Sequence, residues 1–216
     1  MKISLFVVAA LAVATAGQAA ILWDNNIITN GFNGRAISPP AFPNIRVVDD
    51  IIAPVNWWVN RVRFNILEDT TFQHGGTIEV YWYNDVNGQP GGSQIALWTS
   101  TSYTRTPVGS YFGRPAFEYN VDFGQLLVIA GHYWIGPRHP NGSGSGTAYW
   151  MTSDGGPDGA GTSTGYFSLD AGTTWQPEGA GWHHAFVFEG DPVPEPATML
   201  AIGAGLAALA ARRRRK

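Results

Sequence analysis

The middle of the chain is built from short runs in which apolar and polar residues alternate. The clearest run is 116–123, which places Phe117, Tyr119, Val121 and Phe123 on one face and Glu118, Asn120 and Asp122 on the other. Residues 61–66 alternate in the same way. A period of two is typical of a β-strand with one buried face. We predict further strands at 77–84, 94–101, 132–137, 147–152 and 182–189.

Glycine, proline, asparagine and aspartate separate these runs and mark the turns. The segment 84–92 joins two predicted strands, and we place its turn at Pro90 and Gly91 because proline fixes φ and glycine accepts a positive φ. Outside the two ends of the chain no stretch keeps a helical period. The pattern therefore predicts an all-β fold for residues 21–192, a single two-sheet β-sandwich of jelly-roll-like type.

The two ends of the chain follow other patterns. Residues 1–20 contain one lysine, an apolar stretch and small final residues, which predicts a secretory signal peptide with a cut after Ala19 or Ala20. Residues 197–211 are uncharged and would span about 22 Å as a helix, so we predict a short single transmembrane helix. The terminal cations are Arg212, Arg213, Arg214, Arg215 and Lys216, and we expect them to stop translocation and hold the C-terminus in the cytoplasm.

Immediately before the apolar segment stand Val193, Pro194, Glu195 and Pro196. A Pro-Glu-Pro triplet, a small-residue apolar helix and a terminal arginine cluster together resemble the PEP-CTERM sorting signal of Gram-negative bacteria that produce exopolysaccharide. The resemblance covers residues 193–216 and implies that an exosortase, a membrane-embedded processing enzyme, cuts near the triplet. It implies an inner-membrane precursor and a mature protein at the cell surface or outside the cell. An ordinary single-pass anchor with a proline-rich stalk is the alternative.

Three stretches of the middle region also resemble exported β-sandwich domains that often precede this tail. They are Val47-Val48-Asp49-Asp50-Ile51, Gly88-Gln89-Pro90-Gly91 and Ala130-Gly131-His132-Tyr133-Trp134-Ile135. Ile51 replaces the usual aromatic residue of the first motif. The resemblance supports a sandwich and implies no particular activity.

Composition excludes some classes of function. Residues 21–192 contain all nine tryptophans and seven arginines against fifteen acidic residues, a net charge of −8. A nucleic-acid partner is therefore not expected. The chain has no cysteine, so an exported domain of this size must be stabilised by its apolar core rather than by disulfides.

One local motif is sharper than the rest. Ser168, Asp170, Gly172, Thr174 and Trp175 fit the Asp-box pattern S-x-D-x-G-x-T-W, which occurs in sialidases and in many unrelated secreted β proteins. An aspartate at the start of a turn accepts hydrogen bonds from groups ahead of it, and glycine gives the backbone freedom that the turn needs. A sialidase would carry several boxes, an arginine cluster and a tyrosine nucleophile. We therefore interpret the single box as a structural turn.

Neither a metal site nor a catalytic site is predicted. His183 and His184 are neighbours on a predicted strand, as are Asp49 and Asp50, so the members of each pair should face opposite sides. The common hydrolase, metalloprotease and phosphate-loop motifs are absent from the sequence. We expect no cofactor, and a calcium ion could bind only in the polar loops 141–146 and 154–165.

The aromatic residues suggest a surface for sugars. Trp57 and Trp58, with Tyr81 and Tyr83, form a candidate platform for stacking on glycan rings, although large aromatic residues also fill sandwich cores. Three functions stay open. A non-catalytic surface or matrix protein that binds exopolysaccharide is favoured over a secreted carbohydrate-active hydrolase. An ice-binding protein comes last, because no array of regularly spaced threonines is present.

Overall fold

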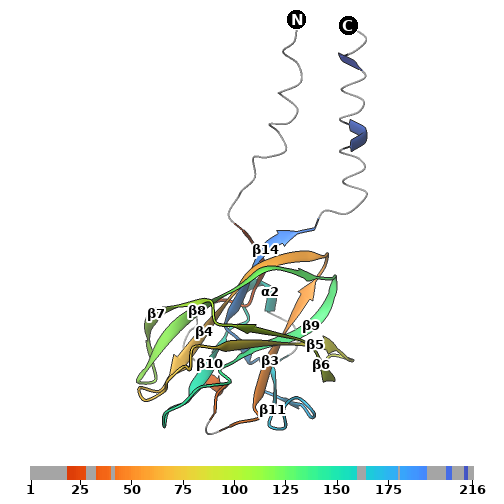
Figure 1. The fold of residues 1–216 in the computed structure, drawn as a ribbon. Helices are drawn as coiled ribbons and strands as arrows, with labels where there is room; N and C mark the ends of the chain where they lie inside the picture. Colours follow the sequence, from red (N-terminus) through yellow and green to blue (C-terminus); the bar gives the residue numbers. More distant parts are fainter. Residues whose placement is uncertain are drawn as a thin grey trace, which may run out of the picture.

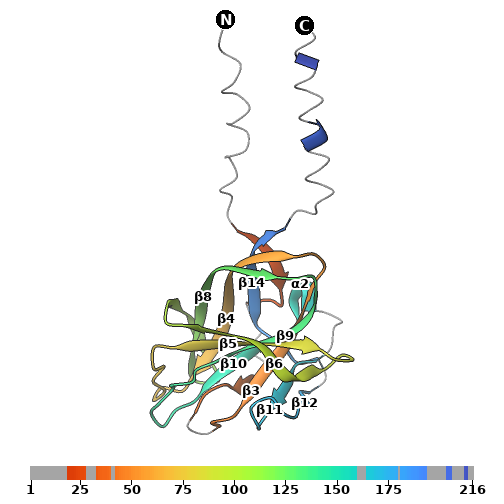
Figure 2. The same ribbon diagram turned by 45° about the vertical axis from the view of Figure 1, so that its right-hand side comes forward.

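The computed structural model describes residues 19–27, 33–39, 42–159, 164–179, 181–193, 203–205 and 212–213. Two antiparallel sheets pack face to face (Figures 1 and 2). The chain passes repeatedly from one sheet to the other, so strands that are consecutive in the sequence often belong to different sheets. The predicted all-β, two-sheet sandwich is confirmed. Residues 1–18 of the predicted signal peptide lie outside the described residues. The first strand begins at Ala20.

The first sheet is centred on the long strand β4. Its main strands, in spatial order, are β7 (Tyr103–Tyr111), β8 (Arg114–Val128), β4 (Trp57–Glu68), β14 (Phe186–Pro192) and β1 (Ala20–Asp24). Where β14 leaves the edge of β4, that edge is taken over by β10 (Ala148–Ser153). β10 in turn pairs with β2 (Gly34–Ala36) and β13 (His183–His184).

The second sheet faces the first across the core. Its spatial order is β12 (Gln176–Pro177), β11 (Tyr166–Ser168), β3 (Arg46–Ala53), β9 (Gly131–Arg138), β5 (Ile78–Asp85) and β6 (Pro90–Ser100). One helical turn, α2 (Gly156–Gly159), lies between β10 and β11. β11 covers only the beginning of β3, from Arg46 to Val48, so the rest of that edge is left to other segments.

The two alternating runs that led the prediction pair with each other. Val62 lies opposite Val121, and Phe64 lies opposite Tyr119, in the β4–β8 register. These four side chains are fully buried, as the alternation predicts. Each such side chain contributes roughly 1.5–3 kcal/mol when it leaves water, so the β4–β8 strand pair supplies a large part of the core.

Aromatic rings fill the space between the sheets. Trp82 from the second sheet contacts Phe188 and Phe123 of the first, with ring centroids 5.6 and 6.4 Å apart. A second, smaller cluster lies on the outer face of the second sheet and consists of Val48, Tyr81, Tyr83, Trp134 and Tyr166. Trp175 packs against this outer cluster, so the segment that carries the Asp-box pattern covers it.

The turn between β5 and β6 differs from the prediction. Asp85 pairs with Pro90, which places Pro90 inside β6 rather than at the turn. The chain reverses at Asn87 and Gly88, whose φ angles are 56° and 78°. Two successive positive φ angles match the twist of a hairpin, and Asn-Gly is the sequence that adopts them most readily.

Candidate functional site

The first and last strands of the sandwich lie side by side. Ala20, the first residue of β1, pairs with Gly190 of β14, so the chain enters and leaves the domain at the same end (Figure 1). Val193 follows β14 and donates a backbone hydrogen bond to the carbonyl of Asn56 (2.7 Å). The predicted sorting tail therefore begins where the last strand ends.

Most of that tail lies outside the described residues. These undescribed positions include Pro194, Glu195 and Pro196, the larger part of the predicted span 197–211, and 214–216. Residues 203–205 and the first two arginines of the cluster, Arg212 and Arg213, are helical. Within the described part of the chain, no helix is long and apolar enough to cross a membrane.

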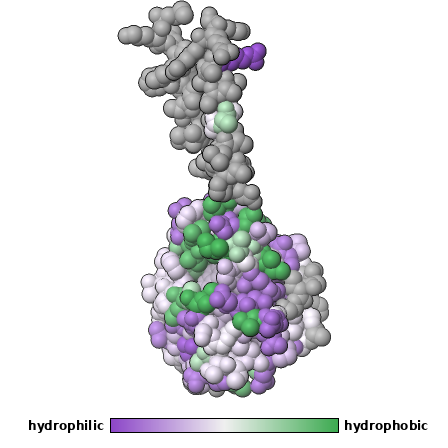
Figure 3. All heavy atoms as spheres, turned by 90° about the vertical axis from the view of Figure 1, so that its right-hand side faces the viewer, coloured by the Kyte–Doolittle hydropathy of each residue, from purple (hydrophilic) through white to green (hydrophobic). Residues whose placement is uncertain are grey.

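Apolar side chains are exposed beside the exit of the tail. Trp58 of β4 lies between Asp191 of β14 and Leu127 of β8 in the sheet register. Trp58 and Leu127 are exposed, as are Ile129 and Ile21. Figure 3 shows such residues gathered at this end of the domain. We call Ile21, Trp58, Leu127 and Ile129 the exit patch.

The predicted glycan platform is wrong in three of its four residues. Trp57, Tyr81 and Tyr83 are at most 3% exposed. Trp57 lies in the main core, whereas the two tyrosines belong to the outer cluster beneath the Asp-box segment. Only Trp58, which is 36% exposed, has a free ring surface among the four. Alternation gave the correct faces, but a covering segment buried the face that was expected to be open.

The Asp-box pattern forms a closed turn held by its own side chains. Asp170 Oδ1 accepts hydrogen bonds from Ser168 Oγ (2.7 Å) and the Thr174 amide (2.9 Å), and Oδ2 accepts one from Thr174 Oγ1 (2.7 Å). These bonds, the Thr174 amide first, lower the pKa of Asp170 to about 2. Gly172 has a φ of 90°, and its amide donates to Ser168 Oγ (2.8 Å).

The turn also holds Trp175 in place over the outer cluster. The Trp175 ring meets Tyr83 edge-on, with centroids 4.9 Å apart, and its Nε1 donates to the Gly91 carbonyl (3.2 Å). Every oxygen of the Asp170 carboxylate is thus engaged within the turn, and the aromatic residue of the pattern faces inward. This geometry matches the structural interpretation of the box.

A buried cluster of acidic residues and histidine lies where the two sheets meet. Asp49 and Asp50 of β3 and His183 of β13 each offer a ligand-type atom, and these atoms lie within 4.8 Å of one another. The two adjacent aspartates face opposite sides of β3, as predicted, yet their carboxylates both come close to His183. β3 is no longer covered by β11 at these positions, so carboxylates from both faces reach around the open edge to the same histidine.

Asp49 is fixed in place by three donors. Its Oδ2 accepts hydrogen bonds from Asn25 Nδ2 (3.0 Å) and from the amide of His184 (2.5 Å), and its Oδ1 accepts one from the amide of Asp50 (2.9 Å). Burial lowers the pKa of His183, but the nearby Asp49 and Asp50 outweigh it and raise the pKa overall. The cluster thus connects the segment that follows β1, at Asn25, with β3 and β13.

The neighbouring histidine serves a different set of partners. His184 stacks on Trp150 with centroids 4.3 Å apart, and its Nε2 lies 3.7 Å from Glu178 Oε1. Glu178 also accepts a hydrogen bond from Arg35 Nε (2.9 Å). His183 and His184 therefore diverge, as their adjacency on a strand predicts.

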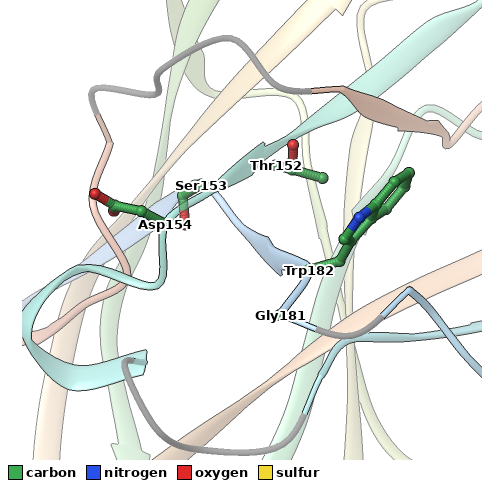
Figure 4. Close-up of a pocket in the computed structure, with 5 residues that line it drawn as sticks. All are labelled: Thr152, Ser153, Asp154, Gly181 and Trp182. Carbon is green, nitrogen blue, oxygen red and sulfur yellow. The ribbon is translucent and has the colours of Figure 1, made fainter.

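A pocket of about 250 Å³ opens next to this cluster. Its lining residues are Thr152, Ser153, Asp154, Gly181 and Trp182, with the Trp182 ring and the Asp154 carboxylate on opposite sides (Figure 4). Ser153 pairs with His183 in the β10–β13 register. Its hydroxyl donates to the carbonyls of Asn25 (2.5 Å) and His184 (3.3 Å) and accepts a hydrogen bond from the Gly155 amide (3.1 Å), so it is held by the surrounding backbone.

Comparison with known proteins gives one match. The family model described as the PEP-CTERM protein-sorting motif matches residues 192–215. Neither the curated proteins nor the solved structures gave a match. The matched segment begins at Pro192, the last residue of β14. The chain therefore carries a PEP-CTERM sorting motif, which marks an exported protein that an exosortase sorts.

Proposed function

We propose that the sandwich is a non-catalytic surface or matrix protein, held at the inner membrane by its tail until an exosortase cuts near Pro194-Glu195-Pro196. The observation that carries this proposal is the position of the motif, which starts at the last residue of the last strand. Cutting after β14 removes no strand from either sheet. The domain would therefore leave the membrane with its fold intact.

The exit patch supports a precursor that lies against the bilayer. Only three residues separate Val193 from the start of the apolar segment at Ala197, a distance of at most about 14 Å along an extended chain. Tryptophan and aliphatic side chains favour the membrane interface, where rings can sit at the level of the headgroups. Trp58 and Leu127 are exposed beside β14, so in the anchored precursor they would lie next to that interface.

Intact-mass measurement of a strain that contains an exosortase tests the proposal. We expect the released protein to lack the arginine run, and the Glu195→Ala variant to remain uncut in the inner membrane. Asp191→Ala is the matched control, since it removes an acidic residue just before the motif and should be processed normally. Full-length tails on released wild-type protein, in a strain that carries the enzyme, would refute the proposal.

The pocket favours sugar binding as a second function. An aromatic ring such as Trp182, set against a carboxylate and a threonine hydroxyl, is a combination that suits a pyranose ring. A glycan array probed with the full chain and with Trp182→Ala tests this. Phe112→Ala, which removes another exposed aromatic ring, is the matched control. Exopolysaccharide fragments bound by wild type and by the control, but not by Trp182→Ala, would support it, and equal binding by all three would contradict it.

A further inference from the structure

Three side chains of the buried cluster are spaced as ligands of one metal ion. His183 Nδ1 lies 3.6 Å from Asp49 Oδ1, and all three ligand-type atoms fall within 4.8 Å of one another. Nitrogen and oxygen ligands about 2.0–2.2 Å from a tetrahedral zinc ion lie roughly 3.4 Å apart. The separation of the histidine and aspartate atoms is therefore too long for a hydrogen bond and close to that expected for two ligands of one ion.

The buried histidine of the cluster has a ring nitrogen without a hydrogen bond. His183 is 5% exposed, and its Nδ1 has no hydrogen-bond partner within the described ranges. A buried ring nitrogen without a partner is costly. This nitrogen faces Asp49 and Asp50, so an ion placed between the three groups would provide the missing interaction.

The carboxylates are already oriented by an outer set of hydrogen bonds. Asp49 is fixed by Asn25 and by the amide of His184. Asp50 Oδ2 lies 3.0 Å from His132 Nε2, and the other ring nitrogen of His132 lies 3.4 Å from Asp85 Oδ1. Partners of this kind orient metal ligands and hold them in place when the ion binds.

We propose that Asp49, Asp50 and His183 bind a divalent first-row transition-metal ion, best matched by Zn²⁺, which joins the edge of β3 to β13. Two carboxylates balance the charge of the ion. One imidazole with two carboxylates suits zinc, whereas calcium takes six to eight oxygen ligands. Three protein ligands leave one position for water. The neighbouring pocket is lined in part by Ser153, which pairs with His183 in the β10–β13 register.

The ion would connect the two sheets. β3 belongs to the second sheet, whereas β13 pairs with β10 of the first. The chain has no cysteine, so no disulfide can tie the sheets together. A metal site assembled only in the folded state adds its binding free energy to folding. The proposed role is therefore structural, and it does not depend on sorting or on sugar binding.

Metal titration of the full chain tests the proposal. The protein is purified in detergent without a histidine tag, stripped with a chelator and titrated with ZnCl₂, while bound metal and Tm are measured. We expect one zinc ion per chain and a Tm increase that the chelator reverses, with a smaller effect of CaCl₂. His183→Gln and Asp50→Asn should each weaken zinc binding at least 100-fold. His74→Gln, which removes an exposed histidine, should bind as wild type.

Zinc X-ray absorption of the wild-type protein covers the case in which a variant fails to fold. We expect a first shell of nitrogen and oxygen atoms that includes one imidazole. A shell without imidazole would overturn the proposal. So would a folded His183→Gln variant that keeps the wild-type stoichiometry and affinity, or a stripped wild-type chain that takes up no zinc. None of these results would alter the test of Glu195, so the two proposals fail separately.

Discussion

The ion pair between Glu68 and Arg105 tests how much the fold depends on pairing a buried charge. Glu68 sits at the end of β4 with its side chain 4% exposed. Its two carboxylate oxygens accept hydrogen bonds from Arg105 Nε (3.0 Å) and Nη2 (2.6 Å), and the Tyr119 hydroxyl donates a further bond to it. The guanidinium lies 3.1 Å from the centroid of the Phe117 ring. Arg105 therefore neutralises a buried charge and also covers an aromatic side chain.

We predict that Arg105→Ala lowers the free energy of unfolding by about 3–5 kcal/mol, because it leaves the Glu68 carboxylate buried without its cation. For a chain of this length, that loss corresponds to a Tm decrease of roughly 6–20 °C. Glu68→Gln should recover part of the loss when it is added to Arg105→Ala, since the glutamine carries no charge to bury. Urea unfolding followed by tryptophan fluorescence measures all three variants.

A surface pair provides the control. Arg61 and Asp122 form an ion pair of 3.1 Å in which each side chain is about half exposed, so Arg61→Ala should cost under about 1 kcal/mol. If Arg105→Ala lowers the free energy of unfolding by equally little, the loss of Arg105 does not leave Glu68 as an uncompensated buried charge. If the double variant is as unstable as the sum of its single changes, the two side chains act independently and the reasoning is wrong.

Three further changes test other parts of the chain. Asp170→Ala should lower Tm, because the turn loses the carboxylate that accepts its hydrogen bonds, and should leave tail processing unchanged on an intact-mass measurement. Neutral residues at 212–215 should let the C-terminus move out of the cytoplasm, which protease accessibility of the tail detects. Burial lowers the pKa of His139 to about 4, so the unfolded chain binds a proton below about pH 6.5 that the folded chain does not. Stability should fall as the pH drops from about 6.5 to 4, and His139→Gln should flatten that part of the urea-unfolding profile.

The sequence predicted the parts of the fold that depend on local alternation. Val62 and Val121 lie opposite each other because both sit on the apolar face of an alternating run, and any register that kept those faces inward would bury them. Burial of Tyr83 could not be predicted in this way. It depends on Trp175, which comes from a distant segment and packs over the outer face of the second sheet.

The missed hairpin turn had a signal in the sequence. Asn87-Gly88 and Pro90-Gly91 both favour turns, and both lie in one short segment. The pairing of Asp85 with Pro90 leaves Asn87 and Gly88 at the centre of the reversal, where both residues have a positive φ. Proline cannot adopt such an angle, so the twist of the flanking strands decides between the two candidates.

The cluster of Asp49, Asp50 and His183 shows where the alternation rule stops being sufficient. The rule states that neighbours on a strand face opposite sides, and it holds for His183 and His184, which have separate partners. It gives the direction of a side chain at its base but not the reach of its end. At an edge that β11 leaves uncovered, two carboxylates on opposite faces can bend toward a third strand. The pairing of β13 with β10 brings His183 to that edge, and this approach depends on the topology of both sheets. A site formed in this way can be found only after the sheets have been assembled, although each of its residues is visible in the sequence.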